Sequence, residues 1–469
     1  MTGRLAGVDP RAWAPVLSGG DYAEVYLEES WSTSLHLEDS RPEEIASGSD
    51  VGLGLRILRR SPCPAGFETR FGSLNNLDRE AALNLARRLA GGAAATGASP
   101  SRLDGAILER VAQPVALPPE EAGLERKIGL REDVDRALRA EFPQLRQVSL
   151  TYGERRKAFL LLNSDGDARL EERTAVLFAA SLTAEKNGVL QTGHEVIGGA
   201  KGLELFAQHD PLRLARAAAA RAVAKLDAPR AEAGEMPVVL AASAGGTFVH
   251  EAIGHSLEAD HVQEGSSPAY KGMLGKAVAP EFLSIIDDPT LPFQRGSYVF
   301  DDEGARARPV AVIKDGVLRE YLYDRVTAAK DGRASNAHGR RESYRHRPIP
   351  RMSNLYIAPG RDDPARILSE LDRGLLVTRM GGGQVNTATG EFVFEVDEGF
   401  WVEGGVVRRR VRDANLLGVG PETLKSIDRL GWDIGWGIGT CGKDGQGVPV
   451  SDGQPTLRVP KMLVGGKHD

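Results

Sequence analysis

The chain has 469 residues, of which 41% are hydrophobic and 26% charged, proportions that are ordinary for a globular protein. A chain of this length usually forms more than one core, so we expect two domains. The net charge is -6 and basic residues are balanced by acids along the chain, which gives no reason to expect a nucleic-acid partner. No stretch approaches the length of uncharged apolar residues that crosses a membrane, so we expect no membrane contact.

The cysteine content and the first residues predict where the protein resides. Only Cys63 and Cys441 occur, which is no disulfide framework and favours a reducing compartment. Residues 1–10 contain no apolar core typical of a signal peptide. We therefore expect a cytoplasmic protein.

The first half combines alternating strand patterns with amphipathic helices. Strands are predicted at residues 22–28, 33–37, 51–58, 147–152 and 158–163. Helices are predicted at residues 78–91, 120–142 (with a break at Gly129) and 212–226. The sequence Asn-Ser-Asp-Gly-Asp at 163–167 is typical of a hairpin turn. This half is predicted to be a strand meander with helices.

The polar segment 230–235 marks the expected boundary, which gives domains at residues 1–232 and 233–469. In the second half, strands outnumber helices and do not alternate with them. They are predicted at residues 237–242, 296–300, 310–313, 320–323, 354–358, 390–396 and 399–407. The acidic group at 301–303 is interpreted as a solvated turn. The predicted fold class is α+β, with a largely antiparallel C-terminal β domain that carries the candidate metal-site helix.

The most informative motif is His250-Glu251, followed by His255. Two histidines that bind zinc, with a carboxylate that activates the bound water, are typical of zinc peptidases. The usual spacing is four residues, whereas five residues turn the second imidazole roughly 140° away on an α-helix. A π-type turn would bring the two together, and so would a distortion at Gly254. The remaining alternative is that the two histidines do not share a ligand.

A third ligand is not evident from the spacing. Glu258 could be a ligand, a partner of a ligand, or an exposed helix carboxylate. Cys441 lies among glycines beside Lys443, in what we interpret as a loop where a thiolate could be exposed and stabilised. It could equally be a small buried apolar residue, or a thiolate that completes a set of two histidines and one cysteine.

Two further segments are candidates for binding substrate. Residues 338–354 are dense in hydrogen-bond donors between prolines, and we hypothesise that Arg341, Tyr344 or His346 binds a substrate carbonyl or carboxylate. The glycine-rich run that includes Gly382, Gly383 and Gln384 is typical of a close backbone approach or of an edge strand that pairs with an extended ligand.

Taken together, several motifs resemble the TldD/PmbA family of metallopeptidases, and in particular its metal-bearing TldD-type subunit. The motifs are HEAIGH at 250–255 with LEAD at 257–260, DDEG at 301–304, GRRESY at 339–344, PIPRM at 348–352, GGGQV at 381–385, CGKDGQ at 441–446 and GQPTL at 453–457. They occur in order and cover most of the second half. In the first half the resemblance is carried by the meander and by VGLGLR at 51–56.

The resemblance implies a zinc peptidase, with one Zn²⁺ per active subunit held by His250, His255 and Cys441 and with Glu251 as the general base. It also implies a homodimer, or a heterodimer with a TldE/PmbA-like subunit, that encloses the site in a cavity. Unfolded peptides or leader peptides are the implied substrates, bound by strand-like pairing. The alternatives are a metal-binding partner or regulatory subunit without activity, and a hydrolase of small amides.

Overall fold

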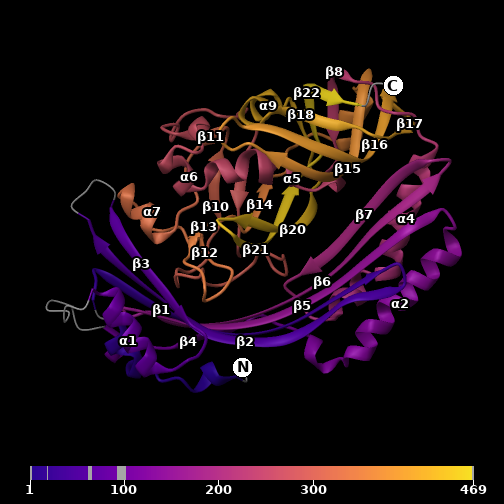
Figure 1. Cartoon of the computed structure of the whole chain (residues 1–469). Coiled ribbons are helices and arrows are strands. Elements are labelled where there is room, and N and C mark those ends of the chain that lie inside the picture. The colour runs from indigo at the N-terminus through magenta and orange to yellow at the C-terminus, as the bar shows by residue number, and fades with distance from the viewer. Residues whose placement is uncertain (1–2, 18, 62–65, 92–101, 467–469) are drawn as a thin grey trace.

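The computed structural model describes residues 3–17, 19–61, 66–91 and 102–466, so Cys63 lies outside the described residues. Its first half is one long curved sheet, and its second half sits in the concave side of that sheet (Figure 1). The strand order is β3-β2-β1-β5-β6-β4, and β7 also pairs with β6. The strands are β1 (Tyr22–Glu38), β2 (Arg41–Arg60), β3 (Phe67–Leu74), β4 (Glu109–Ala112), β5 (Leu145–Asn163), β6 (Ala168–Lys186) and β7 (Val189–Gly199).

These strands are longer than the sequence patterns predicted. The two strands expected at 22–28 and 33–37 form the single strand β1, and those expected at 147–152 and 158–163 form β5. The polar residues between each pair still bond into the ladder, for example where Trp31 pairs with Arg156. The turn predicted at 163–167 is confirmed, because the Asn163 N–H donates to the Asp167 carbonyl between β5 and β6.

Helices cover the two ends of this sheet. The helices of this half are α1 (Arg79–Leu89), α2 (Leu124–Glu141), α3 (Glu204–Gln208) and α4 (Pro211–Leu226). Asp78 caps α1, because its side chain accepts from the Ala81 N–H, as the sequence predicted. The predicted break at Gly129 is wrong, since α2 continues through it and nothing crowds that residue. Two separate apolar cores result, one beneath α1 and one beneath α2 and α4.

The second half contains a ring of strands and a flatter sheet. The ring runs β15-β8-β22-β18-β16 and closes because β15 also pairs with β16, while β17 and β19 flank it. These strands are β8 (Gly234–Leu240), β15 (Arg373–Val385), β16 (Glu391–Glu403), β17 (Val406–Val411), β18 (Asn415–Val419), β19 (Arg429–Leu430) and β22 (Leu457–Gly465). All pairs except β8 with β15 are antiparallel, which confirms the predicted class.

The flatter sheet of the second half supplies one wall of the candidate site. Its order is β11-β10-β9-β14-β21-β20, and β20 forms a hairpin with β21 at the edge. The elements are β9 (Ile285–Asp287), β10 (Val310–Lys314), β11 (Val317–Leu318), β14 (Asn354–Ile357), β20 (Gly435–Lys443) and β21 (Gln446–Gln454). The remaining strands and α-helices of the described residues are β12 (Gly339–Arg340), β13 (Ile349–Pro350), α5 (Thr247–Val249), α6 (Ala259–Glu264), α7 (Arg325–Lys330), α8 (Pro364–Ser369) and α9 (Gly420–Ser426).

Several local predictions in this half are wrong. Residues 296–300 and 320–323 form no strand, and their extended backbone makes only isolated bridges at Phe300 and Leu322. The strands predicted at 390–396 and 399–407 are divided at the wrong place. The observed strand β16 continues to Glu403, and β17 begins only after the turn Gly404–Gly405. Local alternation cannot reveal such differences, because a strand also needs a partner at the right place.

A buried ionic network joins the two halves. The guanidinium of Arg56 on β2 lies 2.8 Å from Glu24 and 2.5 Å from Glu303, and all three side chains are almost inaccessible. Asp301 and Asp302 are buried beside Glu303, so the acidic group is not the solvated turn that the sequence suggested. Among the described residues, no helix is long and apolar enough to cross a membrane.

Candidate metal centre and active site

A π turn brings the two histidines of the motif together. The chain leaves α5 and widens at His250–Gly254 into a π turn. The imidazole centroids of His250 and His255 are therefore only 5.2 Å apart, with the ring planes at 89°. Of the alternatives left open by the spacing, the π-type turn is the one that the chain adopts. A larger residue at Gly254 would crowd the core, since a Cβ would lie 2.1 Å from Met352 Sδ.

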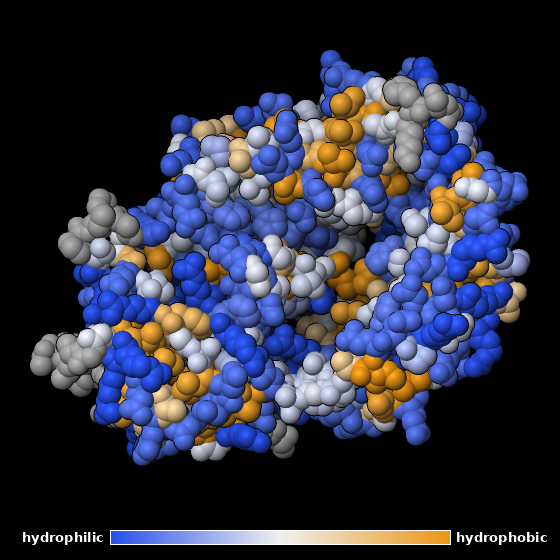
Figure 2. Space-filling model, in the orientation of Figure 1, coloured by the Kyte–Doolittle hydropathy of each residue, from blue (hydrophilic) through white to orange (hydrophobic). Residues whose placement is uncertain are grey.

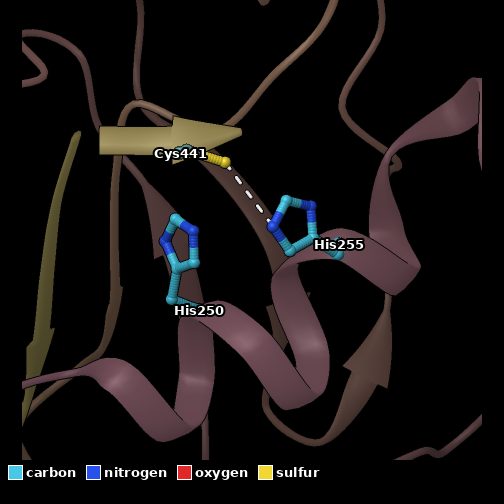
Figure 3. Close-up of side chains that lie close together, drawn as sticks. All are labelled: His250, His255 and Cys441. Carbon is cyan, nitrogen blue, oxygen red and sulfur yellow. Dashed lines mark hydrogen bonds between the residues drawn. The ribbon is translucent and has the colours of Figure 1, made fainter. Parts of the chain in front are cut away.

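Cys441 completes a compact group of three side chains. Its Sγ lies 3.5 Å from His255 Nε2, and one ligand atom from each of His250, His255 and Cys441 lies within 4.8 Å of the others. Figure 3 shows the thiol and the two imidazoles converging from the strand and from the helical segment. All three residues are buried. Cys441 is thus not in an exposed loop, because β20 pairs with β21 along its whole length.

The donor set fits a zinc ion. Two imidazoles and one thiolate, held close together away from bulk water, are donors that bind Zn²⁺ well. Harder cations such as Mg²⁺ and Ca²⁺ bind oxygen donors instead. Burial alone would raise the pKa of Cys441, but hydrogen bonds from His250 and His255 lower it to about 5. The thiol is therefore ready to act as a thiolate ligand at neutral pH.

The orientation of His255 is set by a carboxylate. Its Nδ1 lies 3.1 Å from Glu258 Oε2, so Nε2 is the nitrogen that faces Cys441. Burial would lower the pKa of His255, whereas the charge of Glu258 raises it well above the usual value. Burial would raise the pKa of Glu258, but Lys443 and His255 hold it well below the ordinary range. Glu258 is fully buried and is not the exposed helix carboxylate considered from the sequence.

Glu251 lies beside the same nitrogen. Its Oε2 is 4.0 Å from His255 Nε2, and its side chain is 30% exposed while the imidazole of His255 is 11% exposed. The carboxylate therefore borders both the group of three ligands and the solvent. A base in this position can reach a water molecule at the metal centre.

A cavity of about 1000 Å³ lies next to this centre, between the two halves of the molecule. It is lined by residues of β7, β15, β16 and β20 together with segment 292–294, and Figure 2 shows the surface hollowed there, with hydrophobic side chains inside. Thr247, one turn before His250, and Ile438, on the same strand as Cys441, belong to its wall. The cavity thus adjoins the segments that carry His250 and Cys441, while His250, Glu251, His255 and Cys441 themselves do not belong to its wall.

Comparisons with known proteins identify this arrangement. Models of the three domains of PmbA/TldA metallopeptidases match residues 23–93, 117–226 and 233–466. The chain belongs to the PmbA/TldD family. It is 34% identical over 459 residues to the metalloprotease TldD homolog of Haemophilus influenzae, covering 96% of this chain and 93% of that protein. It is 36% identical over 247 residues to a zinc metalloprotease TldD homolog of Saccharolobus solfataricus, covering 52% and 55%.

Solved structures of low sequence identity share the fold. A putative modulator of DNA gyrase from Thermotoga maritima superposes with a TM-score of 0.77 at 21% identity, over 95% of this chain and 96% of that one. TldE from Thermococcus kodakarensis superposes with a TM-score of 0.72 at 16% identity, over 95% and 97%. The fold of this PmbA/TldD chain is therefore one already seen in solved structures.

Two of the residues predicted to bind substrate lie elsewhere. Arg341 is buried and ion-paired with Glu24 at 2.5 Å, in the ionic network between the halves. The Tyr344 ring is fully buried against Gly52 of β2, and its hydroxyl is 3.0 Å from both Asp50 and Asn75. Neither side chain reaches the cavity, so their placement speaks against substrate binding. Their ion pair and hydrogen bonds join the two halves of the molecule instead.

The other substrate candidates are divided. His346 is half-buried, with Nδ1 3.1 Å from Ser343 Oγ, and it does not line the cavity. Gly382 does line it, and Gly383 and Gln384 follow on the same exposed end of β15. Gly383 has a steric reason to be glycine, because a Cβ would lie 1.9 Å from the Phe394 ring.

Two further residues at the centre bind groups that the sequence did not predict. Arg351 is fully buried and donates to the carbonyls of Cys441 and Gln446, which fixes the strand that carries the thiol. Lys443 does not contact the thiol but binds Glu258 at 3.1 Å. Only the motifs PIPRM and CGKDGQ could have drawn attention to these two residues, since nothing local predicts their partners.

Proposed function

We propose that this chain is a zinc-dependent peptidase that hydrolyses unfolded peptides or leader peptides. The observation that carries the proposal is the convergence of His250, His255 and Cys441, with the carboxylate of Glu251 at the same imidazole nitrogen. A structural zinc site has no use for a solvent-accessible carboxylate beside its ligands, whereas hydrolysis needs a base there.

In this proposal the three ligands hold one zinc ion, which when bound supplies Lewis acidity toward the scissile carbonyl and lowers the pKa of water. Glu251 takes the proton of the attacking water and returns it to the leaving amine. Its partial exposure allows water to reach it, while the buried imidazole beside it keeps its position fixed. A base of this kind typically contributes about 10²–10⁴-fold to the rate.

The edge of β20 is suited to holding an extended peptide. The two-residue turn Asp444–Gly445 joins β20 to β21, and Thr440 lies opposite Pro449, which has no N–H to donate. In an antiparallel pair, successive residues of a strand alternately bond to the partner strand and point away from it. These two features therefore fix which residues of β20 bond to β21. The backbone groups of Trp436, Ile438, Thr440 and Gly442 therefore point away from β21. Among the described residues, no other strand pairs with this edge.

Strand β7 lines the same cavity and, within the described part of the chain, pairs only with β6. A peptide between the two strands could pair with either backbone irrespective of its side chains. Apolar residues at the wall, including Leu190, Phe293 and Ile438, would contact side chains that a folded substrate keeps hidden. A cavity of about 1000 Å³ admits an extended segment but not a folded domain.

The proposal is tested by digesting an unstructured peptide with the purified full chain and with Glu251→Gln, while the zinc content of both is measured. We expect both proteins to contain one zinc per chain and only the wild type to cleave. Glu264→Gln, at an exposed glutamate on α6, is the matched control and should cleave like the wild type. Cleavage by Glu251→Gln at the wild-type rate would refute the proposed role of Glu251.

The alternatives give different results in the same experiment. A non-catalytic subunit would bind zinc and cleave nothing, even in the presence of a partner. A hydrolase of small amides would turn over amide substrates of one residue and leave longer peptides intact.

The assembly stays a prediction, either a homodimer or a heterodimer with a TldE-like subunit. The similarity of fold to TldE supports a partner of the same architecture. Mass measurement in solution, with and without such a subunit, distinguishes the two forms.

A further inference from the structure

A buried charged pair, neither residue of which lines the cavity, connects two of the three ligand side chains. Glu258 follows the π turn and contacts His255, with its Oε2 3.1 Å from Nδ1. The same Oε2 lies 3.1 Å from Nζ of Lys443, which is two residues beyond Cys441 on β20. The helical segment that carries His255 and the strand that carries Cys441 are thus joined by one carboxylate and one ammonium group.

The ammonium group of Lys443 is fully occupied. Besides Glu258, it donates to Asp260 Oδ1 at 2.7 Å and to the Pro350 carbonyl at 3.0 Å. An ammonium has three donors, so no donor remains for a substrate or for the thiol. The Lys443 side chain is only 4% exposed. These contacts fix Lys443, and Lys443 in turn fixes the carboxylate of Glu258.

Glu258 is not placed to bind the metal itself. The side chains that can share a cation are His250, His255 and Cys441, and Glu258 is outside that group. Its Oε2 accepts from Nδ1 of His255, so in the neutral ring that binds a metal the free nitrogen is Nε2, which faces Cys441 Sγ. Partners of this kind set the tautomer and the direction of a metal-binding imidazole.

We propose that Glu258 and Lys443 are positioning residues of the metal centre. Glu258 selects the His255 tautomer that offers Nε2 to the metal, and Lys443 locks Glu258 to the strand that supplies Cys441. The pair thereby holds two ligands that are 186 residues apart at the separation that one ion requires. This inference rests on the proposed zinc site but not on peptidase activity.

The test is zinc affinity, measured by chelator competition on the full-length protein. Glu258→Gln keeps the shape of the side chain but loses its charge, and Lys443→Met loses the ammonium group. Each should weaken zinc binding by about 10- to 100-fold. Because Lys443 acts through Glu258, the double variant should lose less affinity than the product of the two single losses. Lys276→Met, at an exposed lysine, is the matched control and should bind zinc like the wild type.

A spectroscopic readout separates positioning from a general loss of structure. With bound Co²⁺, the variants should show altered d–d and thiolate charge-transfer bands while the circular dichroism of the metal-free proteins stays unchanged. Should Glu258→Gln fail to fold, Glu258→Asp retains the charge for Lys443 but shortens the reach to His255, and the same loss of affinity is expected.

Two outcomes would overturn the inference. One is folded variants of Glu258 and Lys443 that bind zinc within about twofold of the wild type. The other is independent, fully multiplicative losses in the double variant. A wild type that binds zinc but cleaves no peptide would refute only the peptidase. A wild type that binds no zinc would refute both proposals.

Discussion

Gly254 is the last residue of the π turn and packs against Met352 and Leu355, so its replacement by alanine offers a sharp test of the site. Its backbone angles are helical, with φ -58° and ψ -52°. Alanine is therefore compatible with the backbone and, by helix propensity alone, would stabilise it by about 1 kcal/mol. The added methyl group would, however, lie 2.1 Å from Met352 Sδ and 2.7 Å from Leu355 Cδ2. Both neighbours are fully buried, so neither can move aside freely.

Overpacking of a dense core costs about 1–3 kcal/mol, which outweighs the gain in propensity. With the gain of about 1 kcal/mol subtracted, we expect Gly254→Ala to be less stable than the wild type by up to about 2 kcal/mol. The helical segment must also move away from Met352, which displaces the next residue, His255. We expect zinc affinity to fall by roughly tenfold as a result.

The assay is denaturant unfolding of the metal-free protein together with zinc titration. Gly129→Ala is the matched control, because Gly129 lies within α2 with no atom near its would-be Cβ. It should be stabilised by about 0.5–1 kcal/mol and bind zinc normally. In a Met352→Ala background, the shorter of the two close contacts is removed and Leu355 gains room to move, so Gly254→Ala should destabilise clearly less than it does in the wild type. Wild-type stability and zinc affinity in the single variant would refute the steric argument, and additivity in the double variant would do the same.

Three further predictions concern sites away from the metal. Arg131 on α2 is fully buried, and its guanidinium has no hydrogen-bond partner among the described residues. Arg131→Met should therefore raise the free energy of unfolding by about 1–3 kcal/mol, measured with denaturant. A lower free energy of unfolding would show that the charge has a partner. Burial and the charge of Glu303 raise the pKa of Asp324 to about 7, so stability should fall as pH rises from about 4 through 7, by up to about 4 kcal/mol. Asp324→Asn should flatten the dependence of Tm on pH over this range, and an unchanged slope would contradict the assignment. A Cβ at Gly52 would lie 2.2 Å from the Tyr344 ring and 2.5 Å from the Leu74 carbonyl. Gly52→Ala should therefore lower Tm, because it disturbs the contact between the two halves of the molecule. An unchanged Tm would refute the importance of this contact.

Local chemistry in the sequence was sufficient for two of the helices of the first half and for recognising the central motif. Residues 79–89 and 211–226 form helices because their apolar faces and caps depend only on neighbours within a few residues. The pairing of His250 with Glu251 likewise predicted metal-assisted hydrolysis, since it depends on residue type. The resemblance to the family rested on the same short motifs, and the comparisons confirmed it.

The sequence alone did not decide how the five-residue spacing of the histidines is resolved or where Cys441 lies. The π turn depends on the space beside Gly254, which Met352 and Leu355 limit from distant parts of the chain. Cys441 becomes buried only because β20 pairs with β21 and Arg351 holds its carbonyl.

Tertiary structure also decided which polar residues lie at the candidate metal centre and which join the two halves of the molecule. From their residue types, Arg341 and Tyr344 were candidates for binding substrate. The close approach of β2 instead buries them between the two halves of the molecule. Glu258 could be exposed, a ligand or a partner of a ligand, and its contact with Lys443 decides the matter. The physical reason is the same in each case. The energy of a charged or hydrogen-bonding side chain depends on what surrounds it, and those surroundings come from residues far away in the chain.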